Sequence, residues 1–169
     1  NDYVPNNLTT ISSKFSNSNK QLVFEAKEAF ERMATDALEQ GYTIRAISAY
    51  RSYDYQKGLY DSYVKKDGIE LADSYSARPG FSEHQTGLAL DIFSPTSSMQ
   101  NFHETEEYKW LQNNSYKYGF ILRYPKDKTD ETLYQYEPWH YRYVGIKITT
   151  YIKKHNISFE EYYVKHIEK

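Results

Sequence analysis

The chain has 169 residues, which is enough for one domain with a substantial core and too few for two catalytic domains. Its 21 Lys and Arg residues against 23 Asp and Glu residues give a formal net charge of −2, so the chain lacks the positive field that nucleic-acid binding requires. Cysteine is absent, which excludes disulfides, zinc ribbons and thiol nucleophiles and leaves His, Asp and Glu as the possible metal ligands.

The N-terminal half of the chain begins with a polar segment. Residues 1–19 are rich in Asn, Ser and Thr, and we expect them to be a spacer in front of a single domain at 20–169. Apolar residues at helical spacing predict a helix over 22–38. Residues 42–50 alternate and are rich in β-branched and aromatic side chains, which predicts a strand. A serine that can cap a helix opens the next predicted helix at 52–66.

The C-terminal half alternates between strands and helices. Residues 77–85 contain a Pro-Gly turn signal and are expected to form a loop, and a strand is predicted over 87–93. The remaining predicted elements are a helix at 104–118, a strand at 120–124, a loop at 125–132, a strand at 139–144, a helix at 146–155 and a terminal helix opened by a capping box of Ser158 and Glu161. Several connections are too short for βαβ crossovers, which favours an α+β fold with a largely antiparallel central sheet flanked by helices.

Five histidines are candidates for metal binding, and their surroundings in the sequence differ. His155 and His166 lie in Lys- and Glu-rich helices, where a solvent-exposed face explains them. His103 precedes the acidic start of a predicted helix and is interpreted as a residue of the helix entry. His84 and His140 each lie beside a turn that adjoins a predicted strand, with a carboxylate close in sequence. These two are the candidate ligands.

A carboxylate accompanies each of the two candidate histidines. Asp91 follows His84 by seven positions, and Gly87 between them allows a sharp turn that can bring an imidazole and a carboxylate together. Glu137 precedes His140 by three positions. Two His and one Asp with an open fourth position form the ligand set of a catalytic zinc. A His-to-Asp hydrogen bond in a core without any metal would use the same residue types, and the spacing alone leaves both possibilities open.

Two motifs resemble those of a known enzyme family. The pattern SxHxxGxAxD at positions 82–91 and the pattern ExWH at positions 137–140 resemble the zinc D-alanyl-D-alanine carboxypeptidases and dipeptidases of the VanY and VanX type. The strings SEHQTGLALDIF, EPWHYRYVG and, at 48–56, SAYRSYDYQ are most similar to the VanY and LdcB branch, whose members trim bacterial cell-wall peptides. The resemblance covers roughly residues 20–155 and implies the hedgehog/D-Ala-D-Ala peptidase fold.

The resemblance implies a role for each motif residue. His84, Asp91 and His140 would bind one Zn²⁺ ion, Glu137 would be the catalytic base, and Arg51 would face the scissile carbonyl. Zinc lowers the pKa of bound water, a nearby carboxylate can accept the proton, and a fixed guanidinium can stabilise the negative charge that develops on the carbonyl oxygen.

An exopeptidase must also recognise the free carboxylate at the end of its substrate. Ser82 and Gln56 match positions that recur in the family, whereas Arg78 is suggested by its charge alone. Tyr50 and Trp139 are candidates for the wall of the cleft, although an aromatic residue that alternates in a strand is more often part of the core. Tyrosine is unusually frequent, with 19 residues, and its polar tip suits clefts that bind peptides.

Taken together, the resemblance implies a zinc-dependent carboxypeptidase that removes the C-terminal D-alanine from peptidoglycan stem peptides, with either D,D or L,D specificity. The alternatives are a peptidoglycan endopeptidase and a non-catalytic, zinc-containing module that binds the cell wall. The mean hydropathy of −0.85 predicts no membrane span in this sequence. We expect a monomer that acts in the bacterial cell envelope, outside the cytoplasm, and is anchored to the membrane through a segment absent from this sequence.

Overall fold

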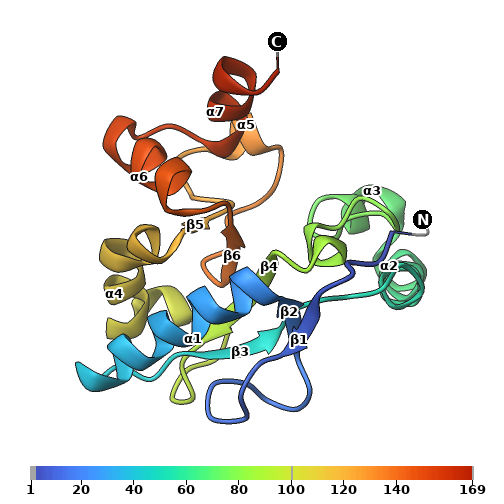
Figure 1. The fold of residues 1–169 in the computed structure, drawn as a ribbon. Coiled ribbons are helices and arrows are strands. Elements are labelled where there is room, and N and C mark those ends of the chain that lie inside the picture. The colour runs from blue at the N-terminus through green and yellow to red at the C-terminus, as the bar shows by residue number, and fades with distance from the viewer. Residues whose placement is uncertain (1–2, 100, 169) are drawn as a thin grey trace.

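A four-stranded sheet forms the centre of the computed structural model, which describes residues 3–99 and 101–168 (Figure 1). The strands lie in the order β3, β4, β6, β5, and each neighbouring pair is antiparallel. The strands are β3 (Arg45–Ser48), β4 (Ala89–Phe93), β6 (His140–Tyr143) and β5 (Phe120–Leu122). The predicted α+β class with an antiparallel central sheet is confirmed.

Helices lie around this sheet, with α2 and α3 on one side of the molecule and α4 and α6 on the other in Figure 1. The described helices are α1 (Phe24–Glu39), α2 (Tyr53–Asp67), α3 (Ile69–Asp73), α4 (Glu106–Asn114), α5 (Thr129–Thr132), α6 (Ile146–His155) and α7 (Phe159–His166). Two predicted starts are confirmed. The side chain of Ser52 accepts a hydrogen bond from the backbone N–H of Tyr55, and Ser158 and Glu161 form a reciprocal capping box.

The core lies between α1 and the sheet. Its largest fully buried side chains include Phe30 and Met33 from α1, Leu90 and Ile92 from β4, and Tyr141 from β6. The buried positions of α1 recur at intervals of three and four residues, as expected for a helix that presents one face to a sheet. The strands β4 and β6, which this packing buries, carry two of the candidate metal ligands.

The N-terminal residues differ from the prediction of a spacer at 1–19. Strand β1 (Leu8–Thr10) pairs with β2 (Gln21–Val23) in a second, two-stranded sheet. Ile11 and Phe15 are buried in the same core as α1. The guanidinium of Arg45 donates hydrogen bonds to the backbone carbonyls of residues 13, 14 and 16, which fastens the loop between the two strands. The spacer prediction is therefore wrong for residues 8–16, because a polar average composition concealed a few well-spaced apolar side chains.

Other differences concern the ends of elements. The helix predicted from residue 22 begins at Phe24, because residues 21–23 pair with β1. The helix predicted over 104–118 is divided into α4 and a 3₁₀ turn, Ser115–Tyr118. Helix α3 was not predicted, since Gly68, with a φ of 82°, ends α2 and the chain then resumes a helix immediately. The predicted loop at 125–132 contains the single turn of α5.

Gly87 connects the candidate metal loop to β4, and its backbone has a φ of 68°. A Cβ atom there would lie 3.0 Å from side-chain carbons of both Leu8 and Val23. We expect Gly87→Ala to lower the free energy of unfolding by ~1–2 kcal/mol, because an L-residue is strained in this conformation. Urea unfolding measures the change. Gly58→Ala is the matched control, since Gly58 lies within α2 with nothing within 4 Å of its Cβ position and should gain up to ~1 kcal/mol. Equal stabilities for the two variants would contradict the prediction.

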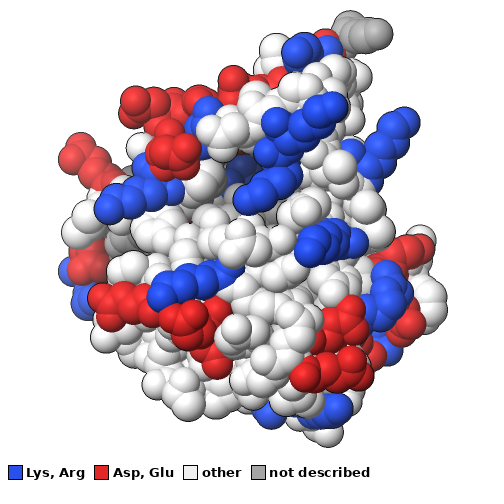
Figure 2. Space-filling model, turned by 90° about the vertical axis from the view of Figure 1, so that its left-hand side faces the viewer, with Lys and Arg blue, Asp and Glu red and all other residues white. Residues whose placement is uncertain are grey.

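Acidic and basic side chains are interspersed on the face of the molecule that Figure 2 displays. Lys and Arg side chains near the upper left and lower edges of this face have Asp or Glu neighbours, whereas several in its upper centre and right do not. This mixture agrees with the small net charge of the sequence.

Candidate active site

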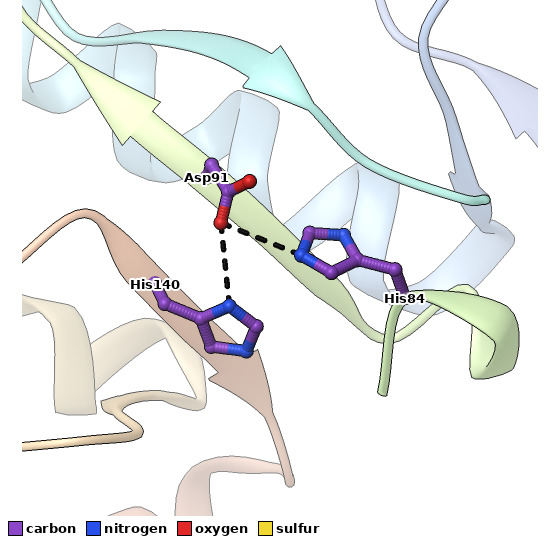
Figure 3. Close-up of side chains that lie close together, drawn as sticks. All are labelled: His84, Asp91 and His140. Carbon is purple, nitrogen blue, oxygen red and sulfur yellow. Dashed lines mark ion pairs between the residues drawn. The ribbon is translucent and has the colours of Figure 1, made fainter. Parts of the chain in front are cut away.

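The fold brings three candidate ligands to one point (Figure 3). His84 lies on a 3₁₀ turn, Glu83–Thr86, that leads into β4, and Asp91 lies in the middle of β4. His140 is the first residue of β6 and stands directly opposite Asp91 in the antiparallel register. The register of two strands and one tight turn therefore sets the position of all three side chains.

The donor atoms of these residues converge. Asp91 Oδ1 lies 3.4 Å from His84 Nε2 and 3.3 Å from His140 Nδ1, and one donor atom from each residue lies within 4.8 Å of the others. All three side chains are buried. Asp91 Oδ1 is buried without a hydrogen-bond partner in the described part of the chain.

A hydrogen bond on the far side of each imidazole determines which ring nitrogen carries the proton and which presents a lone pair to Asp91. His84 Nδ1 lies 2.7 Å from the carbonyl oxygen of Ala49, and His140 Nε2 lies 3.4 Å from Glu83 Oε2. Carbonyl and carboxylate oxygens only accept hydrogen bonds, so in each neutral ring the proton is on that nitrogen. The other nitrogen then directs a lone pair toward Asp91 Oδ1. Three acceptor atoms that converge in a buried site fit a cation, and two imidazoles and a carboxylate suit zinc.

The pKa values of the ligands reflect burial and their mutual contacts. Burial lowers the pKa of His84 from its ordinary value, because the charged imidazolium loses hydration. Burial also opposes ionisation of Asp91, but the imidazolium forms of His84 and His140, whose facing protons a bound cation would replace, outweigh it and hold the pKa of the Asp91 carboxyl well below its usual range. Asp91 is therefore a carboxylate at neutral pH, which is the form that binds a metal.

Glu137 lies on the same side of His140 as Asp91 does. Its Oε2 is 3.6 Å from His140 Nδ1, the nitrogen that faces Asp91. Its backbone N–H donates to the carbonyl of Tyr124 at 3.1 Å, which holds the residue in place ahead of β6. Burial raises the pKa of Glu137 to about 7. A carboxyl group with such a pKa can both accept and return a proton near neutral pH.

Arg51 contacts a ligand directly. Its Nη2 donates to Asp91 Oδ2 at 2.8 Å, and its Nε donates to Ser48 Oγ at 2.9 Å. The guanidinium thus holds the Asp91 oxygen that points away from the two histidines and leaves Oδ1 free for a cation. Nη1 lies 3.5 Å from Gln56 Oε1. Arg51 lines the same cavity as the three ligands and Glu137.

This cavity has a volume of about 360 Å³, and it contains some of the residues predicted to bind substrate. Ser82 and Trp139 line it. Gln56 also lines it, but its amide nitrogen donates to the carbonyl of Ala77 at 2.8 Å and its oxygen faces Arg51. Gln56 therefore supports the wall and Arg51, although the sequence predicted direct substrate contact.

Two predicted substrate residues are not brought into this cavity. The guanidinium of Arg78 forms a two-point ion pair with Asp73, at 2.9 and 2.6 Å, and Arg78 lines a neighbouring hollow that shares Ser76 and Tyr134 with this cavity. Tyr50 lines a different cavity, which Arg51 also borders. Charge suggested Arg78 and aromatic character suggested Tyr50, but neither criterion reveals that Asp73 pairs with Arg78 or which cavity Tyr50 lines.

Sequence reasoning missed several residues of the site. Five tyrosines line the cavity, namely Tyr63, Tyr75, Tyr124, Tyr134 and Tyr136. The high tyrosine content pointed to a cleft lined by tyrosines, but it did not show which of the 19 tyrosines line it. Glu83 was also missed, although it directly precedes His84, because nothing in the sequence indicates that it faces His140.

Comparison with known proteins identifies relatives of the chain. The family model described as VanY, D-alanyl-D-alanine carboxypeptidase, matches residues 19–146. The protein YodJ of Bacillus subtilis (strain 168) is 44% identical over 171 residues, and the match covers 97% of this chain and 63% of YodJ. The chain thus spans less than two thirds of the length of this relative.

Two solved structures are similar in both fold and sequence. The LdcB LD-carboxypeptidase has a TM-score of 0.91 at 44% identity, covering 97% of this chain and 80% of that chain. The vancomycin-resistance D,D-pentapeptidase VanY, solved in complex with Zn(II), has a TM-score of 0.80 at 34% identity, covering 94% of this chain and 92% of that chain.

Proposed function

Because this chain belongs to the VanY family of D-alanyl-D-alanine carboxypeptidases, we propose that it is a zinc-dependent carboxypeptidase that releases the C-terminal D-alanine of peptidoglycan stem peptides. The observation that carries the proposal is the convergence of His84 Nε2, Asp91 Oδ1 and His140 Nδ1 beside Glu137 in one cavity. A purely structural metal site would need no additional carboxylate that is free of the ligand set.

In this proposal His84, Asp91 and His140 hold one zinc ion. When bound, zinc supplies Lewis-acid chemistry, which lowers the pKa of water and polarises the carbonyl of the substrate. Glu137 accepts a proton from the water molecule that attacks the carbonyl carbon. The same carboxyl group then gives that proton to the leaving amine of D-alanine as the peptide bond breaks. The raised pKa of Glu137 suits both transfers.

Arg51 and Ser82 have distinct proposed roles. The Arg51 guanidinium, fixed by Asp91 and Ser48, stabilises the negative charge that develops on the carbonyl oxygen of the substrate. Ser82 lies two positions before His84 and lines the cavity, so its hydroxyl is the proposed donor to the free carboxylate of the substrate. Trp139 and the tyrosines of the cavity provide the apolar walls against which the peptide lies.

The cellular location follows from the proposed substrate. Stem peptides lie outside the cytoplasmic membrane, so we propose that the protein acts there. Among residues 3–99 and 101–168, no helix has the length and apolar character to cross a membrane. Anchoring to the membrane and a monomeric state remain predictions.

The test is incubation of the purified, zinc-loaded protein with synthetic tetrapeptide and pentapeptide stems, with mass spectrometry of the products. We expect loss of one D-alanine from at least one of the stems, elimination of that reaction by a chelator, and recovery on addition of zinc. Loss from the pentapeptide indicates D,D specificity and loss from the tetrapeptide L,D specificity. Cleavage only within cross-linked peptides would instead identify an endopeptidase, and zinc binding without any cleavage would identify a binding module.

A further inference from the structure

We propose that Glu83 is a positioning residue for the metal ligand His140, and that Arg123 and Glu160 hold it in place. The C-terminal helix α7 would thereby contribute to the affinity of the site for zinc. The inference rests on the zinc site of the proposed function, but it concerns residues outside the ligand set. Glu160 also lies beyond residues 19–146, the part of the chain that the family model matches.

Glu83 contacts the edge of His140 that faces away from Asp91. Its Oε2 lies 3.4 Å from His140 Nε2, whereas Glu137 and Asp91 face Nδ1. The two glutamates around His140 therefore have different environments. Glu137 borders the point where the donor atoms converge, and Glu83 can fix the ring and keep its proton on Nε2. A carboxylate in this position also makes the liganding nitrogen more basic.

Glu83 is itself held by Arg123. Arg123 Nε donates to Glu83 Oε1 at 2.7 Å, and Arg142 Nη1 lies 3.6 Å from the same oxygen. The side chain of Arg123 is only 10% exposed and that of Glu83 only 16%. Two guanidinium groups thus offset the charge of Glu83 and orient Oε2 toward His140. A charge-assisted hydrogen bond of this kind is stronger when it is shielded from water.

Arg123 is in turn fixed by α7. Its Nη1 and Nη2 donate to the two carboxylate oxygens of Glu160 at 3.0 and 2.6 Å. The guanidinium also lies over the rings of Tyr124 and Phe159, at 4.9 and 5.4 Å from their centroids. A continuous series of contacts therefore runs from Glu160 through Arg123 and Glu83 to His140. Both carboxylate oxygens of Glu160 and of Glu83, and all three guanidinium nitrogens of Arg123, take part in these contacts.

The expected consequence is a change in zinc affinity. Outer-shell partners of ligating histidines typically contribute about 10–100-fold to metal affinity. We expect Glu83→Ala to lower the zinc affinity by about that factor. Glu83→Gln retains an acceptor for His140 Nε2–H and should recover part of the loss. Glu160→Gln should lower the affinity less, by about a few-fold, because it loosens Arg123 without removing Glu83.

The experiment measures zinc affinity by competition with a chromophoric chelator, with urea unfolding of each zinc-free variant in parallel. Glu161→Gln is the matched control. Glu161 is next to Glu160 on α7, but its carboxylate pairs with Lys128 and accepts a hydrogen bond from the backbone N–H of Ser158. The substitution should lower stability without lowering zinc affinity. Unchanged zinc affinity in Glu83→Ala would overturn the inference, and an equal loss of affinity in Glu160→Gln and Glu161→Gln would overturn the part that concerns Arg123 and α7.

Failure of this inference can be distinguished from failure of the proposed function. Zinc affinity is measured without substrate, so a wild-type protein that binds zinc but cleaves no stem peptide would contradict only the function. A wild-type protein that cleaves stem peptides and a Glu83→Ala variant with wild-type zinc affinity would contradict only the inference.

Discussion

Glu137→Ala should retain bound zinc and lose nearly all turnover. The carboxylate of Glu137 lies beside His140 Nδ1 but is not one of the three converging donors, so the metal site remains complete without it. The lost step is proton transfer from water to the leaving amine. A positioned general base typically contributes 10²–10⁴-fold, so we expect kcat to fall by about 10²–10⁴-fold. Release of D-alanine measures turnover, and metal analysis of the dialysed protein measures zinc content.

An exposed glutamate provides the control for this variant. Glu106 lies on α4, where it pairs with Lys109 and is not among the residues that line the described cavity, and Glu106→Gln should leave both turnover and zinc content unchanged. Glu137→Gln tests the same point with a side chain of equal size, and it should be as inactive as Glu137→Ala because an amide cannot accept the proton. Substantial turnover in either Glu137 variant would remove this residue from its proposed role.

His84→Ala should lose both the metal and the activity. The substitution removes one of three protein donors and leaves the buried Asp91 Oδ1 facing only His140. Outer-shell substitutions already cost about 10–100-fold in metal affinity, so removal of a ligand should exceed about 100-fold. Zinc content after dialysis and chelator competition measure the loss.

A second histidine serves as the control for His84. His155 is exposed at the end of α6, where its ring stacks on Tyr151, and His155→Ala should keep the wild-type zinc content and turnover. The sequence already separated these two histidines by their surroundings. Full zinc occupancy in His84→Ala would show that the ligand set is wrong, whatever the activity of the variant.

The loss of zinc in His84→Ala differs in kind from the loss expected at Glu83. His84 supplies a lone pair to the site, whereas Glu83 only orients the ring that supplies another. A graded series is therefore expected, in which His84→Ala loses the most affinity, Glu83→Ala less and Glu160→Gln the least. Glu137→Ala stands outside this series, because it affects proton transfer and leaves zinc affinity largely intact.

Local sequence was sufficient to locate most of the helices, and the resemblance of two short motifs to a known family supplied the candidate metal ligands. Apolar periodicity located α1 and α6, and capping side chains located the starts of α2 and α7, because helix formation depends on neighbours within one or two turns. His84, Asp91 and Glu137 were selected because each lies in a short motif beside a strand. The residues of each motif lie within ten positions of one another, so the motif can be recognised directly in the sequence.

Tertiary structure alone decided how distant segments meet. Arg51 turned out to hold Asp91 Oδ2 as well as to line the cavity. Gln56 contacts Arg51 and Arg78 pairs with Asp73, although motif position and charge had suggested that these two residues bind the substrate carboxylate. The contact of Glu83 with His140 joins residues 57 positions apart, and that of Arg123 with Glu160 joins residues 37 positions apart. Strand register and helix docking create these contacts, and both depend on how the whole core packs. Local pattern therefore determined which groups are available for chemistry, and packing determined which of their atoms face the cavity.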